Sequence, residues 1–462
     1  RRNLPPQAGT TGNGQHVNTI RSDSAATNET GNQQIMDDSK LRSDDDLKRV
    51  MARDGFSPDL PELLQARPRR RRVGLQLRFM LYMLRGVRVG SLDVTLPNEE
   101  VRHFKGSEPG PHGVLNLRSD GLIRHVLRAG EVGFGEAYLD GCWDSPDLAS
   151  LLAVMYLNEP HYKGPYEKNV LGRLYGWVRH QLRANTKRRA RENIAFHYDL
   201  GNAFYRLWLD ETMAYSSAVF DRSRNETLAE AQRRKFANMA ERLQLKPEHH
   251  LLEIGSGWGG FAIYAAQQYG CRVTSITLSK EQLAEAEQRA AAAGVADRVH
   301  FELRDYRDVT ETYDRVVSIE MYEAVGEAWW PTYFETIRRV LKPGGLASIQ
   351  GITINPSIFE QYRTKRDFIQ KYIFPGGMLC PPGRFQDLAI AAGLKPDDPQ
   401  FFGIDYADTL AIWHLNVMSV REQIVQQFDE RFLRMWRYYL AYCECGFRVG
   451  SIDLMQITLR RD

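Results

Sequence analysis

The sequence predicts a mixed α/β protein, in which a Rossmann-like domain follows a smaller N-terminal α+β domain. Strand-like and helix-like segments alternate from residue 249 onward, and a glycine-rich turn joins the first of these strands to the first helix. A βαβαβ series of this kind is typical of a mostly parallel sheet covered by helices. With 462 residues, the chain is long enough for two or three domains.

The composition predicts a soluble globular protein, with 43% hydrophobic and 26% charged residues. The net charge of +3 gives no reason to expect a nucleic-acid partner. The sequence contains neither a long apolar run that would span a membrane nor an apolar leader after its first residues. Its five cysteines lack the paired spacing of metal sites. We therefore expect no metal, reduced thiols and a cytoplasmic location.

The N-terminal part of the chain divides into a tail and a small domain. Residues 1–45 are polar and predict a disordered tail, because they cannot bury enough apolar surface to offset their ordering entropy. Residues 46–160 are predicted to form the small domain, which begins with a short helix. Strands are expected at 91–96, 113–119 and 122–130, and a helix is expected from about Pro146 with an Asp or Ser N-cap.

Two basic runs flank the folded part of this small domain. Eight arginines and no acids lie between Arg67 and Arg88, and a predicted helical connector at 161–191 ends in a second basic run, 183–191. Two interpretations stay open. The first is a solvated basic face beside a core helix, and the second is an amphipathic surface that meets anionic lipid headgroups.

Residues 192–462 are predicted to form the Rossmann-like domain. Its strands are expected at 249–255, 271–278, 299–306, 313–320 and 344–354, with helices at 259–270 and 280–294. Between the first strand and the first helix lies Glu253-Ile-Gly255-Ser-Gly257-Trp-Gly259-Gly260. Its spacing differs from both the dinucleotide fingerprint and the phosphate loop, and no lysine accompanies it. The loop therefore favours a ligand without a pyrophosphate, such as S-adenosylmethionine.

Polar side chains also follow the next two strands. Thr277 and Gln282 follow the second strand, where they can reach ribose hydroxyls, and Asp305 and Tyr306 end the third, where an adenine would lie. Each of these residues alone is compatible with an ordinary loop or a helix N-cap. Because they occur in order at successive strand ends, they predict one cofactor pocket together with Glu253 and the loop glycines.

Several stretches resemble one family, the cyclopropane-fatty-acyl-phospholipid synthases and their mycolic acid relatives. The resemblance covers about residues 90–460, and the stretches are FHYDLGN (196–202), MAYSSA (213–218), LEIGSGWGG (252–260), TLSKEQ (277–282), RDYRD (304–308), EMYEAVG (320–326), KYIFPGG (371–377) and FLRMWRYYL (432–440). It implies an S-adenosylmethionine-dependent enzyme that moves a methylene group to the double bond of an unsaturated phospholipid acyl chain. The expected product is a cyclopropane.

The resemblance also implies a location, an assembly and a second ligand. It implies a homodimer that associates peripherally with the inner face of an anionic membrane, and a bound bicarbonate ion as general base. The cradle of this ion corresponds to Ser217, Glu323, Gln350, Ile352 through its backbone, and Tyr406. This sequence has Ser217 where the family usually has cysteine and Gln350 where it usually has histidine. Both replacements retain hydrogen-bonding capacity, but neither titrates near neutral pH.

Alternatives stay open for residues and for function. Glu323 is also compatible with a carboxylate favoured by a helix N-terminus, and Tyr406 with a packed core tyrosine. The MAYSSA motif places Tyr215 and Ser216 beside the cofactor, where Tyr215 would stack on the sulfonium or pack in the core. Core positions are expected for the aromatic residues at helical spacing, Trp329, Trp330, Tyr333 and Phe334. The competing functions are an acyl methyltransferase that leaves a methyl or methylene branch, and a non-catalytic lipid-binding protein.

Overall fold

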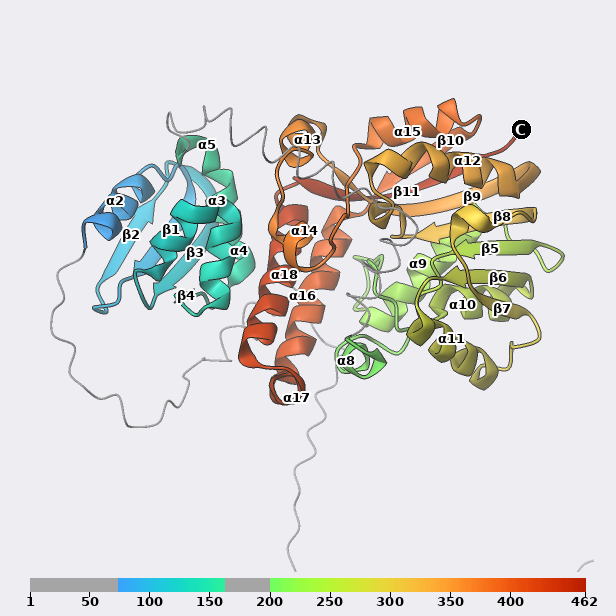
Figure 1. Ribbon diagram of the computed structural model, residues 1–462, viewed down its shortest axis with the longest axis horizontal. Helices are drawn as coiled ribbons and strands as arrows, with labels where there is room; N and C mark the ends of the chain where they lie inside the picture. The colour runs from blue at the N-terminus through green and yellow to red at the C-terminus, as the bar shows by residue number, and fades with distance from the viewer. Residues whose placement is uncertain (1–73, 163–199) are drawn as a thin grey trace, which may run out of the picture. The chain divides into compact units, whose positions relative to one another are not determined.

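The computed structural model describes residues 74–162 and 200–462, which belong to one compact unit of the chain (Figure 1). Several predicted features lie outside the described residues. They are the tail 1–45, the short helix expected after it, the run Arg67–Arg72, the second basic run 183–191, and His197 and Asp199 of the FHYDLGN motif. Within the described ranges, no helix has the length and apolar character needed to cross a bilayer.

The small domain is a four-stranded sheet with helices. Its strands lie in the order β2-β1-β3-β4; β1 pairs parallel with β3, and the other two pairings are antiparallel. The predicted strands at 91–96 and 113–119 lie within β1 and β3, and Asp147 caps α4 by accepting a hydrogen bond from the Ser150 N–H at 2.9 Å. The elements are α2 (Leu75–Leu84), β1 (Val89–Thr95), β2 (Val101–Lys105), β3 (Glu108–Leu117), α3 (Gly121–Leu139), β4 (Trp143–Asp144), α4 (Leu148–Leu157) and α5 (Glu159–Tyr162).

The strand predicted at 122–130 is wrong, because these residues begin helix α3. Their apolar residues come in two pairs, Leu122 with Ile123 and Val126 with Leu127. A spacing of four places both pairs on one helix face, whereas a strand would place members of each pair on opposite faces. The helix is interrupted at Gly130, whose φ of 57° and ψ of −129° are not helical.

The large domain confirms the predicted Rossmann-like fold class. Its seven strands lie in the order β10-β11-β9-β8-β5-β6-β7; β9, β8, β5, β6 and β7 are parallel, and β11 is antiparallel to both of its neighbours. The strands are β5 (His250–Ile254), β6 (Arg272–Thr277), β7 (Val299–Leu303), β8 (Tyr313–Ile319), β9 (Leu341–Ile354), β10 (Lys395–Phe401) and β11 (Ile452–Arg460).

Helices and short 3-10 turns connect these strands and pack beside them. The α-helices are α8 (Asn202–Arg206), α9 (Leu228–Arg242), α10 (Gly260–Tyr269), α11 (Lys280–Ala292), α12 (Trp330–Val340), α13 (Pro356–Tyr362), α14 (Phe368–Tyr372), α15 (Pro382–Ala391), α16 (Gly403–Ser419), α17 (Arg421–Gln427) and α18 (Glu430–Arg448). The 3-10 turns are η4 (Tyr306–Asp308), η5 (Tyr322–Ala324) and η6 (Glu327–Trp329). Trp330, Tyr333 and Phe334 are buried in the core, as expected, and Trp329 packs against it partly buried.

Local sequence signals fix where the helices beside the site begin. Thr227 and Glu230 form a reciprocal capping box at the start of α9. Ser279 caps α11 by accepting a hydrogen bond from the Gln282 N–H. Gly259 precedes α10 with a φ of 82°, a left-handed conformation that suits glycine. These signals place the loops that follow β5 and β6 at the carboxyl edge of the sheet.

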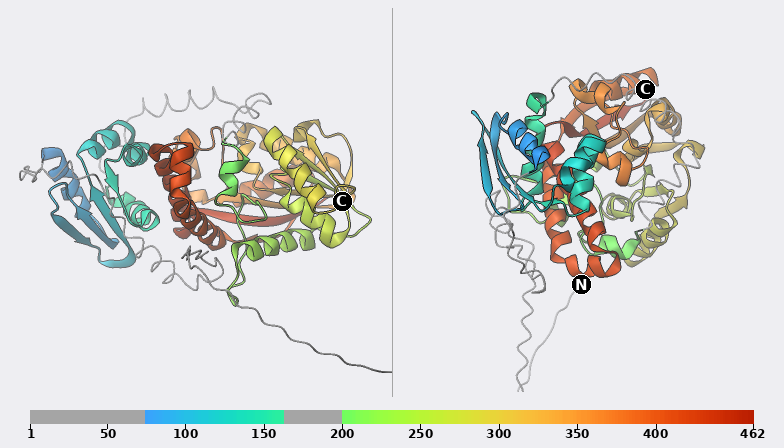
Figure 2. Two further views of the ribbon diagram at one scale, coloured as in Figure 1. Left: turned by 90° about the horizontal axis from the view of Figure 1, so that it is seen from below. Right: turned by 60° about the vertical axis from the view of Figure 1, so that its left-hand side comes forward.

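Helices α16 and α18 pack side by side (Figures 1 and 2), and α18 also contacts α3 and α4 of the small domain. The Arg434 guanidinium of α18 donates to the carbonyl oxygens of Tyr138 and Trp143 and to the Asp144 carboxylate, at 2.7 to 3.0 Å. A second link joins Glu136 of α3 to Lys371 of the KYIFPGG segment. The two domains are therefore joined by buried polar contacts as well as by apolar packing.

Candidate active site

The glycine loop between β5 and α10 has the backbone geometry that its sequence predicts. Gly255, Gly257 and Gly259 have φ values of 97°, 49° and 82°. A Cβ at Gly255 would lie 3.2 Å from the Met321 Cβ, and one at Gly259 would lie 3.0 Å from the Phe301 ring, so both glycines are required by close neighbours. A Cβ at Gly257 would meet no atom of the described part of the chain within 4 Å, and Gly257 lines a cavity. The loop is therefore open to a ligand at Gly257.

Polar residues at the neighbouring strand ends line the same cavity. Thr277 donates its hydroxyl to the Gln282 Oε1 at 2.9 Å, and both residues are buried cavity neighbours. Glu253 at the end of β5 accepts a hydrogen bond from the Ser275 hydroxyl, and burial raises the pKa of Glu253 to about 8. An open glycine turn with a nearby acid and an amide fits the polar groups of S-adenosylmethionine.

At the end of β7, the sequence predicted that Asp305 and Tyr306 would both lie beside an adenine. The Asp305 carboxylate accepts hydrogen bonds from Arg307 Nη2 and Nε at 2.7 and 2.8 Å. Asp305 is buried and is not among the cavity-lining residues, whereas Tyr306 is. The Asp305 side chain therefore shapes the turn through Arg307, and the Tyr306 side chain is the one that borders the cavity.

Three residues predicted for the anion cradle converge on a fourth residue, Glu320. The Glu320 carboxylate accepts hydrogen bonds from the Ser217 N–H at 2.9 Å, the Gln350 Nε2 at 2.8 Å and the Tyr406 hydroxyl at 2.6 Å. The Ser217 hydroxyl itself donates to the Ala218 carbonyl oxygen, so Ser217 contributes through its backbone and not through the side chain. Donors expected around an external anion thus surround a carboxylate of the protein.

The orientation of the Gln350 amide is fixed from its other side. Gln456 of β11 donates its Nε2 to the Gln350 Oε1 at 2.8 Å, which leaves the Gln350 amine to point at Glu320. Both glutamines are fully buried. The final strand of the sheet therefore positions one of the donors, although the sequence prediction assigned no role to that strand.

The other two cradle residues, Glu323 and Ile352, form a separate pair. The Ile352 N–H donates to the Glu323 Oε1, and Glu323 Oε2 is buried without a hydrogen-bond partner among residues 74–162 and 200–462. Burial, followed by the nearby charge of Glu320, raises the pKa of Glu323 to about 8. The site thus contains two neighbouring carboxylates. Both oxygens of Glu320 accept hydrogen bonds, whereas in Glu323 only Oε1 does among the described residues.

Sequence reasoning gave Glu320 no role, although its motif was identified. The available signal was an acid directly after the fourth strand, at the same sheet edge as the other site residues. Glu320 has a φ of 51°, an uncommon conformation for a residue other than glycine. Such strain is typical of functional positions but cannot be read from residue type.

Tyr215 and Ser216 both line the cavity, close to the cradle. The Tyr215 hydroxyl lies 2.7 Å from that of Tyr439, and its ring contacts Tyr205 and Trp413 with centroids 5.4 Å away. The Ser216 hydroxyl accepts a hydrogen bond from Lys235 at 2.6 Å. Tyr215 is therefore a packed aromatic residue that also borders the cavity, and its stacking on the sulfonium stays a prediction.

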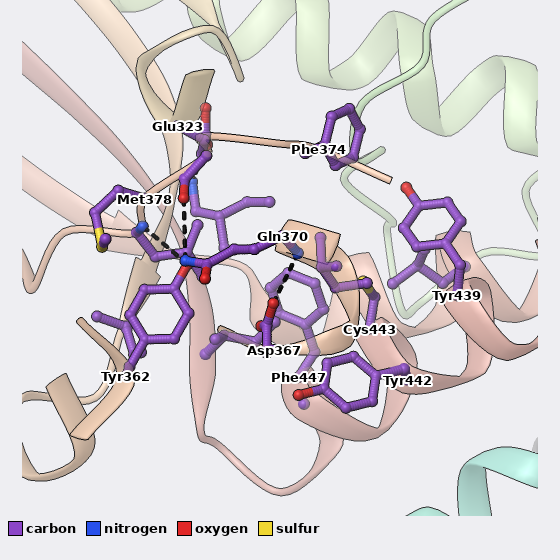
Figure 3. A pocket seen from close by; sticks show the side chains of 18 of the residues that line it. Glu323, Tyr362, Asp367, Gln370, Phe374, Met378, Tyr439, Tyr442, Cys443 and Phe447 are labelled. Atoms are coloured by element: carbon purple, nitrogen blue, oxygen red, sulfur yellow. Dashed lines mark hydrogen bonds between the residues drawn. The ribbon is translucent and has the colours of Figure 1, made fainter. Parts of the chain in front are cut away.

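The cavity has a volume of about 2000 Å³ and extends from the glycine loop past both carboxylates to the apolar faces of α2 and α3. Figure 3 shows Tyr439, Tyr442, Cys443 and Phe447 of α18 around the same pocket as Glu323 and Phe374. The KYIFPGG segment closes one side, where the Met378 N–H that follows it donates to the Glu323 carbonyl at 2.9 Å. The walls are thus mainly aromatic and aliphatic, with acids at the centre.

Comparisons with known proteins agree with this geometry. The family model of mycolic acid cyclopropane synthetase matches residues 185–457. The tuberculostearic acid methyltransferase of Mycobacterium tuberculosis is 41% identical over 77% of this chain and 85% of its own length. The cyclopropane-fatty-acyl-phospholipid synthase of Escherichia coli K12 is 34% identical over 78% of this chain and 90% of its own.

A solved structure also matches the large domain. A mycolic acid cyclopropane synthase complexed with SAH and CTAB is 31% identical and superposes with a TM-score of 0.55 over 59% of this chain and 98% of that one. The fold, the glycine loop and these matches lead to one conclusion. The chain belongs to the mycolic acid cyclopropane synthetase family and is an S-adenosylmethionine-dependent methyltransferase.

Proposed function

We propose that this enzyme transfers a one-carbon unit from S-adenosylmethionine to the double bond of an unsaturated phospholipid acyl chain, with Glu320 as the base. Family membership supports methyl or methylene transfer to lipid acyl chains. The observation that carries the proposal is the convergence of Ser217, Gln350 and Tyr406 on the Glu320 carboxylate. Bicarbonate fits this cradle poorly, because Glu320 already engages these three donors.

The chemistry assigns distinct roles to the residues. S-adenosylmethionine, when bound at Gly257 and Gln282, supplies an electrophilic methyl group. The alkene would attack this methyl group while the carbon–sulfur bond breaks and S-adenosylhomocysteine leaves, and the resulting cation on the acyl chain would be shielded from water by the apolar walls. Glu320 then accepts a proton from the new methyl group, and Tyr406 and Gln350 hold its carboxylate in place. Glu323 lies beside Glu320 as a second acceptor.

The branched product is favoured over the ring. A hydride shift followed by proton loss from the methyl group leaves an exocyclic methylene, whereas direct closure gives the cyclopropane expected from the sequence. Both products add one CH₂ overall. Two observations favour the branch. Glu320 stands where the sequence predicted a bicarbonate ion, and this chain is 41% identical to the tuberculostearic acid methyltransferase but 34% identical to the cyclopropane-fatty-acyl-phospholipid synthase of Escherichia coli. The cyclopropane product remains the second candidate.

An anionic membrane surface is the proposed source of the acyl chain. Phe79 of α2 and Leu127 of α3 line the cavity and are 60% and 75% exposed, although both side chains are apolar. Arg78 and Arg128 flank them in the sequence. Exposed apolar side chains among arginines are typical of surfaces that enter the headgroup region of a bilayer. Association as a homodimer is proposed from the family resemblance alone.

Product analysis tests the proposed function. The enzyme is incubated with methyl-labelled S-adenosylmethionine and vesicles of unsaturated phosphatidylglycerol, and the fatty acids are analysed by mass spectrometry and NMR. We expect a gain of one CH₂ and the olefinic signal of a methylene branch. A high-field ring signal would support the cyclopropane candidate instead, and an absence of labelled fatty acid would contradict both.

The role of Glu320 in place of bicarbonate is tested separately. Because the base belongs to the protein, turnover in buffer depleted of carbon dioxide should equal turnover with added bicarbonate. A strict dependence of the wild-type enzyme on bicarbonate would overturn the assignment of Glu320 but would leave one-carbon transfer intact.

Vesicle binding tests the membrane proposal. Binding to neutral vesicles at high salt that equals binding to anionic vesicles would contradict it.

A further inference from the structure

Lys235 is a buried cation that the proposed mechanism does not use. It lies on α9 with no solvent exposure, and its Nζ donates to the Ser216 hydroxyl at 2.6 Å. Its Nζ also lies 4.7 Å from the centroid of the Phe236 ring. Burying an ammonium group is costly, so a lysine in this position requires compensation from its surroundings.

Helix α9 holds the segment that reaches the base. Gln232, one turn before Lys235, donates its Nε2 to the Ser216 carbonyl oxygen at 2.8 Å. The next residue, Ser217, donates its N–H to Glu320. Two buried side chains of one helix therefore fix Ser216 from both its hydroxyl and its carbonyl oxygen, and the following peptide group binds the proposed base.

Lys235 is also the cation that acts on the acids of the site. Burial raises the pKa of Glu320 above its ordinary value. The hydrogen bond from Tyr406 of α16, the charge of Lys235 and the hydrogen bonds from Ser217 and from Gln350 of β9 oppose this rise only in part. The other charged neighbour of Glu320 is the acid Glu323 of η5. Burial lowers the pKa of Lys235 itself to about 8, and the charges of Glu320, Asp210 and Glu253 oppose this effect.

We propose that Lys235 is a positioning residue of this site, which holds the Ser216 corner beside Glu320 and supplies a positive charge that favours the ionised, proton-accepting form of Glu320. The proposal rests on the proposed function of Glu320. Lys235 forms no bond to substrate and transfers no proton. Its charge acts across the interior, where charges are screened less than in water.

Infrared titration of the full-length protein tests this inference without lipid. The difference between the wild-type protein and Glu320→Gln identifies the Glu320 carboxylate band. In Lys235→Met, which removes the charge at similar volume, we expect the midpoint of this band to rise by at least about one pH unit, a tenfold change in proton affinity. Gln232→Met is the matched control, because it removes the other hydrogen bond to Ser216 without removing a charge and should leave the midpoint in place.

Three outcomes would overturn the proposal. The first is a midpoint in Lys235→Met equal to that of the wild type, and the second is an equal shift in Gln232→Met. Where Lys235→Met does not unfold cooperatively, Lys235→Gln replaces it. The third outcome needs no lysine variant: a Glu320 band that stays protonated up to about pH 8 in the wild-type protein. An active Glu320→Gln enzyme would instead disprove the role of Glu320 as base, while the infrared shift would still report on Lys235.

Discussion

At the scale of single residues, Glu320 brings together backbone strain, burial and a complete set of donors. Its φ of 51° costs a residue other than glycine roughly 1–2 kcal/mol. Its carboxylate is held by a peptide N–H, an amide and a phenol. Stability alone does not account for this arrangement, because glycine at this position would relieve the strain and remove a buried acid.

Glu320→Gly should therefore separate stability from activity. We expect turnover to fall by ~100-fold or more because the base is lost. The urea midpoint should fall much less, because the relieved strain offsets part of the cost of leaving three buried donors without their acceptor. The three donors would be left for a small anion, so added bicarbonate should restore part of the activity. Glu320→Gln fills the cradle with a neutral amide and should not be rescued. Full activity of Glu320→Gly without bicarbonate would disprove the role of Glu320.

Gly257 gives a second test at this scale. Because an added Cβ meets no atom of the described residues within 4 Å, a larger side chain would project into the cofactor space of the cavity. Gly257→Val should weaken S-adenosylmethionine binding at least ~10-fold by calorimetry, with a stability loss of about 1 kcal/mol from the positive φ. Gly294→Val is the control, since Gly294 has a φ of 70°, equally open space and no contact with the cavity. Equal affinity in the two variants would contradict the assigned cofactor site.

The sequence predicted residue types better than their pairings. Gly255, Gly257, Thr277 and Gln282 were predicted from the glycine spacing and the strand order, and they line one cavity, whereas Gly259 is not among its lining residues. The convergence on Glu320 was not predictable, because it depends on a positive φ and on which atom of Ser217 faces the acid. Similarly, Asp305 was assigned from its position, and only its neighbour Arg307 reveals that the carboxylate is already engaged.

At the scale of elements, prediction succeeded where a strand or helix carries its own signal. The capped helix α11 and the central parallel strands have such signals. Strands β10 and β11 were not predicted, because β10 is exposed, contains two prolines and is paired only with β11. Yet β11 supplies Gln456, which orients Gln350. Edge elements with weak local patterns thus contribute to the site through tertiary pairing alone.

Helix α18 permits a prediction about how the domains are joined. Arg434→Met should destabilise the protein by about 2–4 kcal/mol, because it leaves the carbonyl oxygens of Tyr138 and Trp143 without their buried donor; Asp144 Oδ2 keeps its hydrogen bond from Arg118. Arg431→Met is the control on the same helix, since Arg431 is 55% exposed and pairs with Asp140 at 3.4 Å; it should cost less than about 1 kcal/mol. Urea unfolding measures both. Similar losses in the two variants would show that burial of Arg434 is unimportant.

At the scale of the whole molecule, buried acids of opposite character set the pH range of stability. Burial raises the pKa of Glu136, but hydrogen bonds from Lys371, Tyr372 and Arg128 outweigh it and bring the pKa down to about 2. Glu136 joins α3 to the KYIFPGG segment, so its ionised form stabilises the contact between the domains. In Glu253 and Glu323, burial dominates and raises each pKa to about 8.

These shifts predict a stability maximum in mildly acidic solution for the ligand-free protein. The contribution of Glu136 is present above its unfolded pKa of 4.5 and is lost as the pH falls toward 2, since the folded state binds this proton less readily. The contribution of Glu253 is complete below 4.5 and is lost as the pH rises to about 8, because the unfolded chain ionises first. Urea midpoints across this range should therefore decline on both sides, with each acid contributing ~1–3 kcal/mol. Glu136→Gln should flatten the acidic decline alone and Glu253→Gln the alkaline decline alone; if either substitution flattened both, stability would depend on net charge rather than on these two sites.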